Sequence, residues 1–357
     1  MSDIATAAPR KFADRSIVQL TLVRFREFTR QPEAVFWTFV FPILLAVGLG
    51  LAFRSKVPER PRVGVIMAQP AARQVIAALT RDSSVIVEQM DDSAGARALR
   101  TAKIAMLIVP QSDGSVQYIY DPLRNESASA RLIADRAIQK GAGRTDLVKV
   151  AERRVTERGS RYIDFVIPGL LGMNLMGSGI WGIGFAIVDS RSKRLLKRFM
   201  ATPMSRFEYL MSFLFSRMFF LIIEVITLLG FGALVFGVPL RGSIVELSVI
   251  CLFSSLAFGG LGLLIASRAK TVEGVSGLMN FVMLPMWIFS GVFFSSSNFP
   301  GVVQPIIKAL PLTAVNNALR ANMLEGTHLT GLGLEMTVII AWMVISFVAA
   351  LKLFRWR

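Results

Sequence analysis

The feature that most constrains this chain is a series of apolar runs, each about 20 residues long. A helix rises about 1.5 Å per residue, so a run of this length can cross the ~30 Å hydrocarbon core of a bilayer. The chain is therefore predicted to be a polytopic α-helical membrane protein. The six expected transmembrane helices are 34–53, 163–188, 207–235, 243–266, 275–294 and 332–354.

Basic residues set the expected orientation of these spans. Cytoplasmic segments next to a span are enriched in Lys and Arg. Residues 1–33 carry six basic residues, and Lys352, Arg355 and Arg357 lie at the other end of the chain. We therefore expect both termini in the cytoplasm. Within the N-terminal tail, 16–30 has one polar and one apolar side, which predicts an amphipathic helix in the membrane interface.

The segment 54–161 between the first two spans has a different composition. It is polar, and its short apolar stretches are rich in β-branched residues and separated by turn residues. This pattern predicts an α/β domain, which the orientation above places outside the cytoplasm. The predicted strands are 62–67, 85–87, 104–109 and 116–120, and the predicted helices are 71–79, 93–102 and 125–158.

The remaining residues, 162–357, are predicted to form a five-helix transmembrane domain. Within it, 295–331 is too apolar for an ordinary loop and is divided by Pro300, Pro305 and Pro311. We expect this segment to be a re-entrant hairpin on the outer side, because irregular backbone at membrane depth must be covered by protein.

The loop 189–207, on the cytoplasmic side, is strongly basic. At helical spacing its apolar residues fall opposite Lys193, Arg194, Lys197 and Arg198, which predicts a short amphipathic helix. Pro203 should end that helix at Thr202, and Ser205 should begin the next. This arrangement is suited to receive force from a soluble partner, although a simple positive-inside loop is the alternative. The apolar face comprises Leu195, Leu196, Phe199 and Met200.

The chain lacks the residue patterns of an enzyme. No GxxxxGK[ST] phosphate loop occurs, so ATP hydrolysis would have to come from a partner. A single histidine, His328, and a single cysteine, Cys251, provide neither a His-rich metal site nor an intrachain disulfide. The net charge is +16, and membrane topology explains many of the basic residues because they flank apolar spans, so membrane lipids and not nucleic acid are the expected contacts.

Glu224 lies in the middle of the third expected span and is the main intramembrane candidate. Such a carboxylate contacts a proton or substrate, or it is a buried group bonded to a neighbouring Ser, Thr or Asn. Arg217 precedes it by seven residues, about 10 Å along the helix axis, which we expect to be too far for pairing. Met173, Met176 and Met283 could line an adaptable apolar substrate path, with ordinary helix packing as the alternative.

Three stretches of the chain resemble the membrane subunits of type-2 ATP-binding-cassette exporters. Residues 194–203 are similar to that family's charged loop ending in Thr-Pro, although Ser192-Lys193-Arg194 stands where an acidic-Gly-Thr sequence often occurs. Residues 291–294 with Pro300 resemble the end of the fifth span. Residues 310–313 and 318–320 resemble the outer hairpin before the last span.

The resemblance implies a permease homodimer in the bacterial inner membrane, bound to separate ABC ATPase subunits that hold ATP and Mg²⁺. This chain would then carry no cofactor and would export a lipophilic, drug-like or lipid-linked substrate. An alternative is a membrane receptor or envelope scaffold that binds through its external α/β domain. The ATPase-coupling residues implied are Leu195, Leu196, Phe199, Met200, Thr202 and Pro203.

Overall fold

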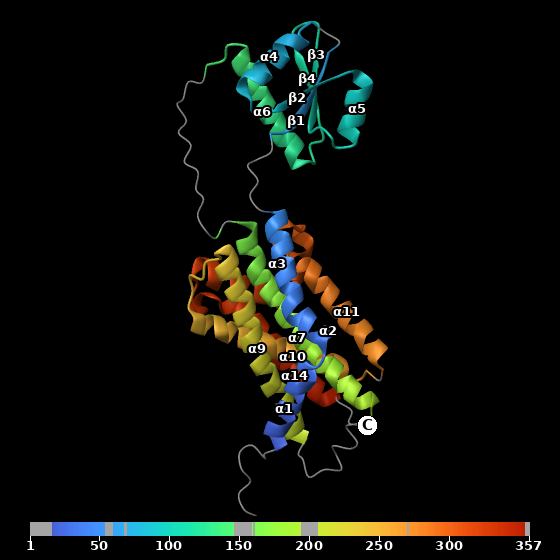
Figure 1. The fold of residues 1–357 in the computed structure, drawn as a ribbon, viewed down its shortest axis with the longest axis vertical. Helices are drawn as coiled ribbons and strands as arrows, with labels where there is room; N and C mark the ends of the chain where they lie inside the picture. Colours follow the sequence, from blue (N-terminus) through green and yellow to red (C-terminus); the bar gives the residue numbers. More distant parts are fainter. Residues whose placement is uncertain are drawn as a thin grey trace, which may run out of the picture. The chain divides into compact units, whose positions relative to one another are not determined.

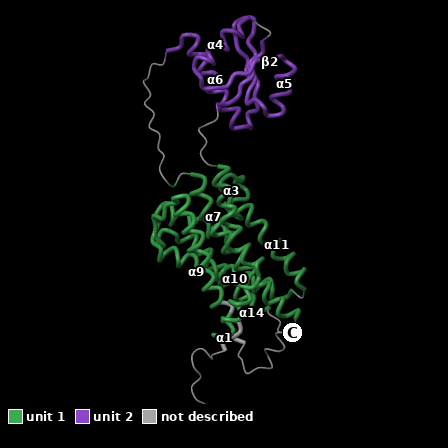
Figure 2. The backbone as a smooth tube through the Cα atoms, in the orientation of Figure 1, with its two compact units in different colours: residues 1–54, 156–357 green, residues 55–155 purple. Residues whose placement is uncertain are grey.

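The structure is a computed structural model that describes residues 16–53, 60–67, 70–145, 159, 161–193, 206–269 and 271–353. It contains two compact units, shown in different colours in Figure 2. The first comprises residues 1–54 and 156–357 and is helical, and the second comprises residues 55–155 and contains the sheet (Figure 1).

Six helices of the first unit are long and apolar enough to cross a membrane, which confirms the predicted class of fold. Each lies within a few residues of an expected span. The first span is built from α2 (Pro32–Val35), a π-helical segment (Phe36–Val40) and α3 (Phe41–Ala52). The others are α7 (Tyr162–Ser192), α9 (Arg206–Phe236), α10 (Ile244–Ala266), α11 (Val272–Phe289) and α14 (Gly333–Leu353).

The fifth span ends earlier than the apolar run that predicted it. Helix α11 stops at Phe289 and not at residue 294, with Ser290 as its C-cap. Gly291 follows with φ of 72°, in the left-handed region where glycine is favoured and where helices commonly terminate. The apolar residues beyond it therefore belong to a turn and not to the helix.

Helix α7 is the centre of the helical unit, because 20 of its 31 residues are buried. It packs against α10 through glycines that bring the two backbones together. A side chain at Gly179 would lie 2.8 Å from Cβ of Phe258, and one at Gly262 would lie 2.7 Å from the carbonyl oxygen of Ile180. Small residues at helix contacts allow this close approach in membrane proteins.

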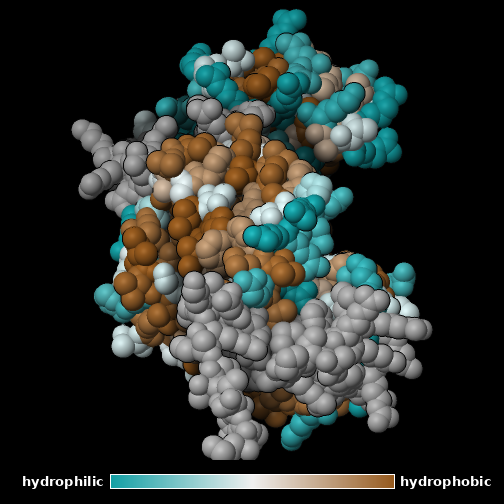
Figure 3. All heavy atoms as spheres, turned by 60° about the horizontal axis from the view of Figure 1, so that its bottom comes forward, coloured by the Kyte–Doolittle hydropathy of each residue, from teal (hydrophilic) through white to brown (hydrophobic). Residues whose placement is uncertain are grey.

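The outer faces of the other spans remain apolar and exposed. Figure 3 shows hydrophobic side chains covering much of the helical unit. Leu51 in α3 is 63% exposed and Leu234 in α9 is 89% exposed. Large exposed apolar surface of this kind marks contact with lipid or with another protein chain.

Helix α1 (Ser16–Thr29) forms in the tail as predicted. Its aromatic side chains pack on α9: the ring of Phe28 lies 4.2 Å from that of Phe220, and the ring of Phe25 lies 5.2 Å from that of Phe219. The apolar side of α1 is thus partly covered by protein.

The segment 295–331 consists of short helices separated near its prolines. Helix α12 covers Gln304–Ala309, α13 covers Pro311–Arg320, and a π-helical turn covers Ala321–Glu325. Leu312, Val315 and Leu319 of α13 are buried. Protein therefore covers α13, whereas Val302 is 89% exposed and Ile306 of α12 is 67% exposed. The place of this segment in the membrane remains a prediction.

The second unit has a four-stranded sheet in the order β2-β1-β3-β4. Strand β1 is parallel to β2 and β3, and β4 is antiparallel to β3. Helices α4 and α6 cover one face and α5 covers the other, so the unit has three layers. The strands are β1 (Arg62–Ile66), β2 (Ile86–Met90), β3 (Met106–Pro110) and β4 (Val116–Ile119); the helices are α4 (Ala72–Asp82), α5 (Asp92–Arg100) and α6 (Asn125–Gly141).

One predicted element of this unit is wrong. The helix expected over 125–158 ends at Gly141, with Ala142 as its C-cap. Gly143 has φ of 98°, a left-handed conformation that an α-helix cannot continue through. Charge and periodicity alone overestimated the length of α6, because the two glycines at its end have low helix propensity.

Candidate functional site

The predicted coupling loop is flanked by two helices of the transmembrane unit. Helix α7 ends at Ser192 and α9 begins at Arg206. Leu195, Leu196, Phe199, Met200, Thr202 and Pro203 lie outside the described residues. Their amphipathic arrangement and their role in coupling remain predictions.

A local ion pair forms at the start of that loop. Nζ of Lys193 donates to Oδ2 of Asp189 at 2.8 Å, one turn earlier in α7. This hydrogen bond raises the pKa of Lys193 above its ordinary value. The pair is solvent-exposed on the lysine side, so it contributes little to stability.

Glu224 and Arg217 form a direct ion pair, so the expectation that they are too far apart was wrong. Nη1 of Arg217 donates to Oε1 of Glu224 at 2.8 Å, and Nη2 donates to Oε2 at 3.1 Å. Helical side chains lean toward the N-terminus, which carries the Glu224 carboxylate back toward Arg217. The long arginine side chain then covers the rest of the separation along the axis.

This pair connects three spans. Oγ of Ser178 in α7 donates to Oε2 of Glu224 at 3.1 Å, and Nε of Arg217 donates to Oγ of Ser255 in α10 at 3.0 Å. Glu224 is 2% exposed and Arg217 is 7% exposed. Glu224 therefore bonds a serine of a neighbouring helix, as the structural alternative required, and Arg217 neutralises its charge.

The predicted path methionines are packed against other helices. Met176 is fully buried in α7, and Met173 and Met283 are nearly so. The terminal carbon of Met283 in α11 lies over Gly177, at 3.9 Å from the position a Cβ would take. Met283 is thus near the turn of α7 that carries Ser178. The packing contacts of these residues are shown, and their place on a substrate path remains a prediction.

A second polar anchor, Arg320 of α13, joins the hairpin to the spans. Its guanidinium lies 3.7 Å from the ring centre of Phe165 and donates to the carbonyl oxygens of Phe165, at 3.2 Å, and of Gly291. Asn316 donates to the carbonyl of Ser290 at 2.8 Å. The C-terminal end of α11 is therefore capped by α13, and the positive charge suits that end of the helix dipole.

These partners are hard to predict from the residue pattern alone. Ser178 stands alone in an apolar run and Ser255 follows Ser254 in another, and Arg320 belongs to a stretch that resembles the family's outer hairpin. A polar residue within an apolar run indicates a side chain that faces other helices, because such residues face the protein interior. The patterns do not identify the atoms that they contact.

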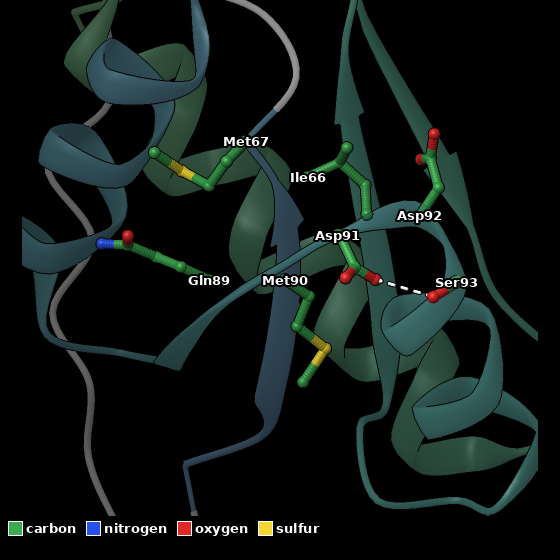
Figure 4. A pocket seen from close by; sticks show the side chains of 7 residues that line it. All are labelled: Ile66, Met67, Gln89, Met90, Asp91, Asp92 and Ser93. Carbon is green, nitrogen blue, oxygen red and sulfur yellow. Dashed lines mark hydrogen bonds between the residues drawn. The ribbon is translucent and has the colours of Figure 1, made fainter.

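The α/β unit has an open hollow of about 640 Å³ where β1 and β2 end (Figure 4). The chain leaves these parallel strands toward helices on opposite faces of the sheet, a common place for ligands. Oδ1 of Asp91 accepts from the backbone N–H of Ala94 at 2.6 Å and from Oγ of Ser93 at 3.1 Å. The Ala94 bond is the main cause that lowers the pKa of Asp91. This carboxylate is thus used to cap α5.

Comparison with known proteins agrees with this architecture. Residues 33–352 match the model of the ABC-2 family transporter proteins. A probable multidrug ABC transporter permease, YbhS of Escherichia coli K12, is 22% identical over 87% of this chain and 89% of its own length. The inner membrane transport permease YhhJ of the same strain is 24% identical over 40% of this chain and 38% of its own length.

Nodulation protein J of Rhizobium meliloti is 31% identical over a shorter region, 31% of this chain and 42% of its own length. The family match covers most of the chain, including all six spans and the α/β unit. Membership implies a partner ABC ATPase subunit and a multi-pass protein of the inner membrane. The chain belongs to the ABC-2 transporter family, as the permease subunit of an ABC transporter.

Proposed function

We propose that this permease belongs to an exporter that moves a lipophilic, drug-like or lipid-linked substrate out of the cytoplasm or the inner leaflet. The observation that carries the proposal is the bonding of Arg217 and Glu224 to each other in the middle of α9. With these charges neutralised, the surrounding core of the described spans is apolar. Such an interior suits a lipophilic substrate, and the mid-span carboxylate of Glu224 is already paired and is not a free charge for coupling to an ion gradient.

The energy for transport would come from the partner ATPase, which binds ATP and Mg²⁺. Closure of the ATPase would displace the coupling loop through Leu195, Leu196, Phe199 and Met200. Because this loop joins α7 to α9, its displacement would swing both spans and open an exit path between two permease copies. The exposed apolar faces of the spans leave surface for such a homodimer.

Transport in inside-out vesicles tests this proposal. Vesicles containing the permease and its ATPase should accumulate a fluorescent lipophilic dye when ATP is added. The cytoplasmic side of the membrane faces the medium in these vesicles, so export from the cytoplasm is measured as uptake. Vesicles with an ATPase variant that binds but does not hydrolyse ATP are the control. Equal accumulation in both preparations, for a panel of lipophilic dyes and a lipid-linked sugar, would contradict ATP-driven export.

A further inference from the structure

The side chain of Arg191 attaches the end of α7 to the end of α10. Arg191 lies in the last turn of α7, just before the coupling loop. Its Nη1 donates to the carbonyl oxygen of Ala266 at 3.0 Å and to that of Ala269 at 2.6 Å. Ala266 is the last residue of α10, and Ala269 lies in the short connection to α11.

The charge and position of Arg191 make this a strong attachment. The last carbonyls of a helix lack partners within the helix and carry the negative end of its dipole. A guanidinium that donates to them is therefore favourable, and hydrogen bonds from a charged donor are stronger than neutral ones. Arg191 is partly buried, which limits competition from water.

The bodies of the same two helices are in backbone contact. A side chain at Gly184 would lie 2.9 Å from the carbonyl oxygen of Gly262, and one at Gly179 would lie 3.3 Å from the backbone nitrogen of Gly259. Contacts this close prevent one helix from sliding past the other without separation. A force that displaces the end of α7 must therefore displace α10 with it or break the Arg191 bonds.

We propose that Arg191 is a positioning residue that transmits displacement of the coupling loop from α7 to α10 and to the connection that begins α11. Helices α7 and α10 then move as one body during transport. This inference rests on the proposed function, because it requires the loop to receive the stroke of the ATPase. Arg191 would thus do more than help orient the spans, which is the role expected of basic residues beside a span.

Replacement of Arg191 by Met tests the proposal in the full permease–ATPase complex. Methionine keeps an extended stem and removes every donor. ATPase binding and hydrolysis should persist, while dye transported per ATP hydrolysed should fall about tenfold, as expected for loss of charged hydrogen bonds. Arg191→Lys, which keeps the charge and can donate to the same carbonyls, should restore much of the loss.

Arg268→Met is the matched control. Arg268 is an exposed arginine in the connection that carries the Ala269 acceptor, and its replacement removes the same charge from that neighbouring connection. It should transport dye at the wild-type ratio. A wild-type ratio in Arg191→Met, or an equal loss in Arg268→Met, would overturn the inference.

A distance measurement tests the same idea without changing Arg191. Spin labels at Ser192→Cys and Arg268→Cys, in a Cys251→Ser background, report the separation of the two helix ends. The distance between these two labels within one protomer should be the same in the nucleotide-free and the ATP-trapped complexes. The distance between the Ser192→Cys labels of the two permease copies should change. A shift of more than about 5 Å, one helical turn, within a protomer would overturn the inference even if Arg191→Met does not fold.

The two possible failures are distinguishable. If the wild-type complex shows no ATP-dependent transport, the proposed function fails and this inference fails with it. If the wild-type complex transports dye and Arg191→Met does so at the same ratio, only the inference fails.

Discussion

Neutralising Glu224 alone should destabilise the transmembrane unit strongly. In Glu224→Gln the amide can still accept one hydrogen bond, but Arg217 keeps its charge. That guanidinium is 7% exposed and would have no counter-charge among its described contacts. Leaving one member of a buried ion pair unpaired costs about 3–5 kcal/mol. Gln is therefore a severe change here, whereas a carboxylate bonded only to neutral groups would tolerate it.

Removing both charges should be much less harmful. Replacing a buried ion pair by apolar residues of similar volume is often neutral or stabilising. In Arg217→Met with Glu224→Leu, Ser178 retains a partner because its hydroxyl also reaches the carbonyl of Asn174 at 2.6 Å. The double variant should recover about 3 kcal/mol relative to Glu224→Gln, as coupling between contacting residues predicts.

Reversible unfolding of the purified permease in mixed micelles with increasing dodecyl sulfate would measure these free energies. Dye transport by the same variants separates stability from function. If Glu224→Gln unfolds at the wild-type midpoint, or if the double variant is as unstable as the single one, the ion pair does not stabilise the unit as argued. If the double variant folds normally but does not transport, the pair has a direct role in transport.

Three further predictions concern topology, coupling and the hairpin. In a Cys251→Ser background, an impermeant thiol reagent added to spheroplasts should label Ser93→Cys and not Ser192→Cys, and the reverse pattern would contradict the predicted orientation. Leu196→Ala with Phe199→Ala should release the ATPase or uncouple its hydrolysis from export, because each buried side chain contributes about 1.5–3 kcal/mol. Lys193→Gln should behave as wild type in the same pull-down, since its ion pair is exposed. Arg320→Met should speed amide hydrogen exchange in α13 relative to Lys308→Met, because it removes the bonds to Phe165 and Gly291, and equal exchange rates in the two variants would argue against this anchor.

Much of the architecture could be predicted from the sequence because the determining forces are local. A run of about 20 apolar residues is long enough to span a bilayer whatever its neighbours are. The alternation of short β-branched stretches with turn residues likewise identified the α/β unit. Helix ends were harder to predict than spans. Charge and periodicity would continue helix α6 beyond Gly141, but Gly143 has a left-handed backbone conformation, so the predicted helix was too long.

The candidate site depended on tertiary structure. Glu224 could be selected by its position in an apolar run, but its pairing with Arg217 depends on side-chain direction and on Ser178 and Ser255 of two other helices. The acceptors of Arg191 lie 75 and 78 residues along the chain, and Phe165 lies 155 residues from Arg320. Helix α7 is apolar on every side, so its hydrophobic pattern does not specify which helix packs on which face. The close fit of its glycines against α10 and the hydrogen bonds of Ser178 and Arg191 specify that arrangement, because lipid tails offer an apolar helix no less favourable surroundings than another helix does.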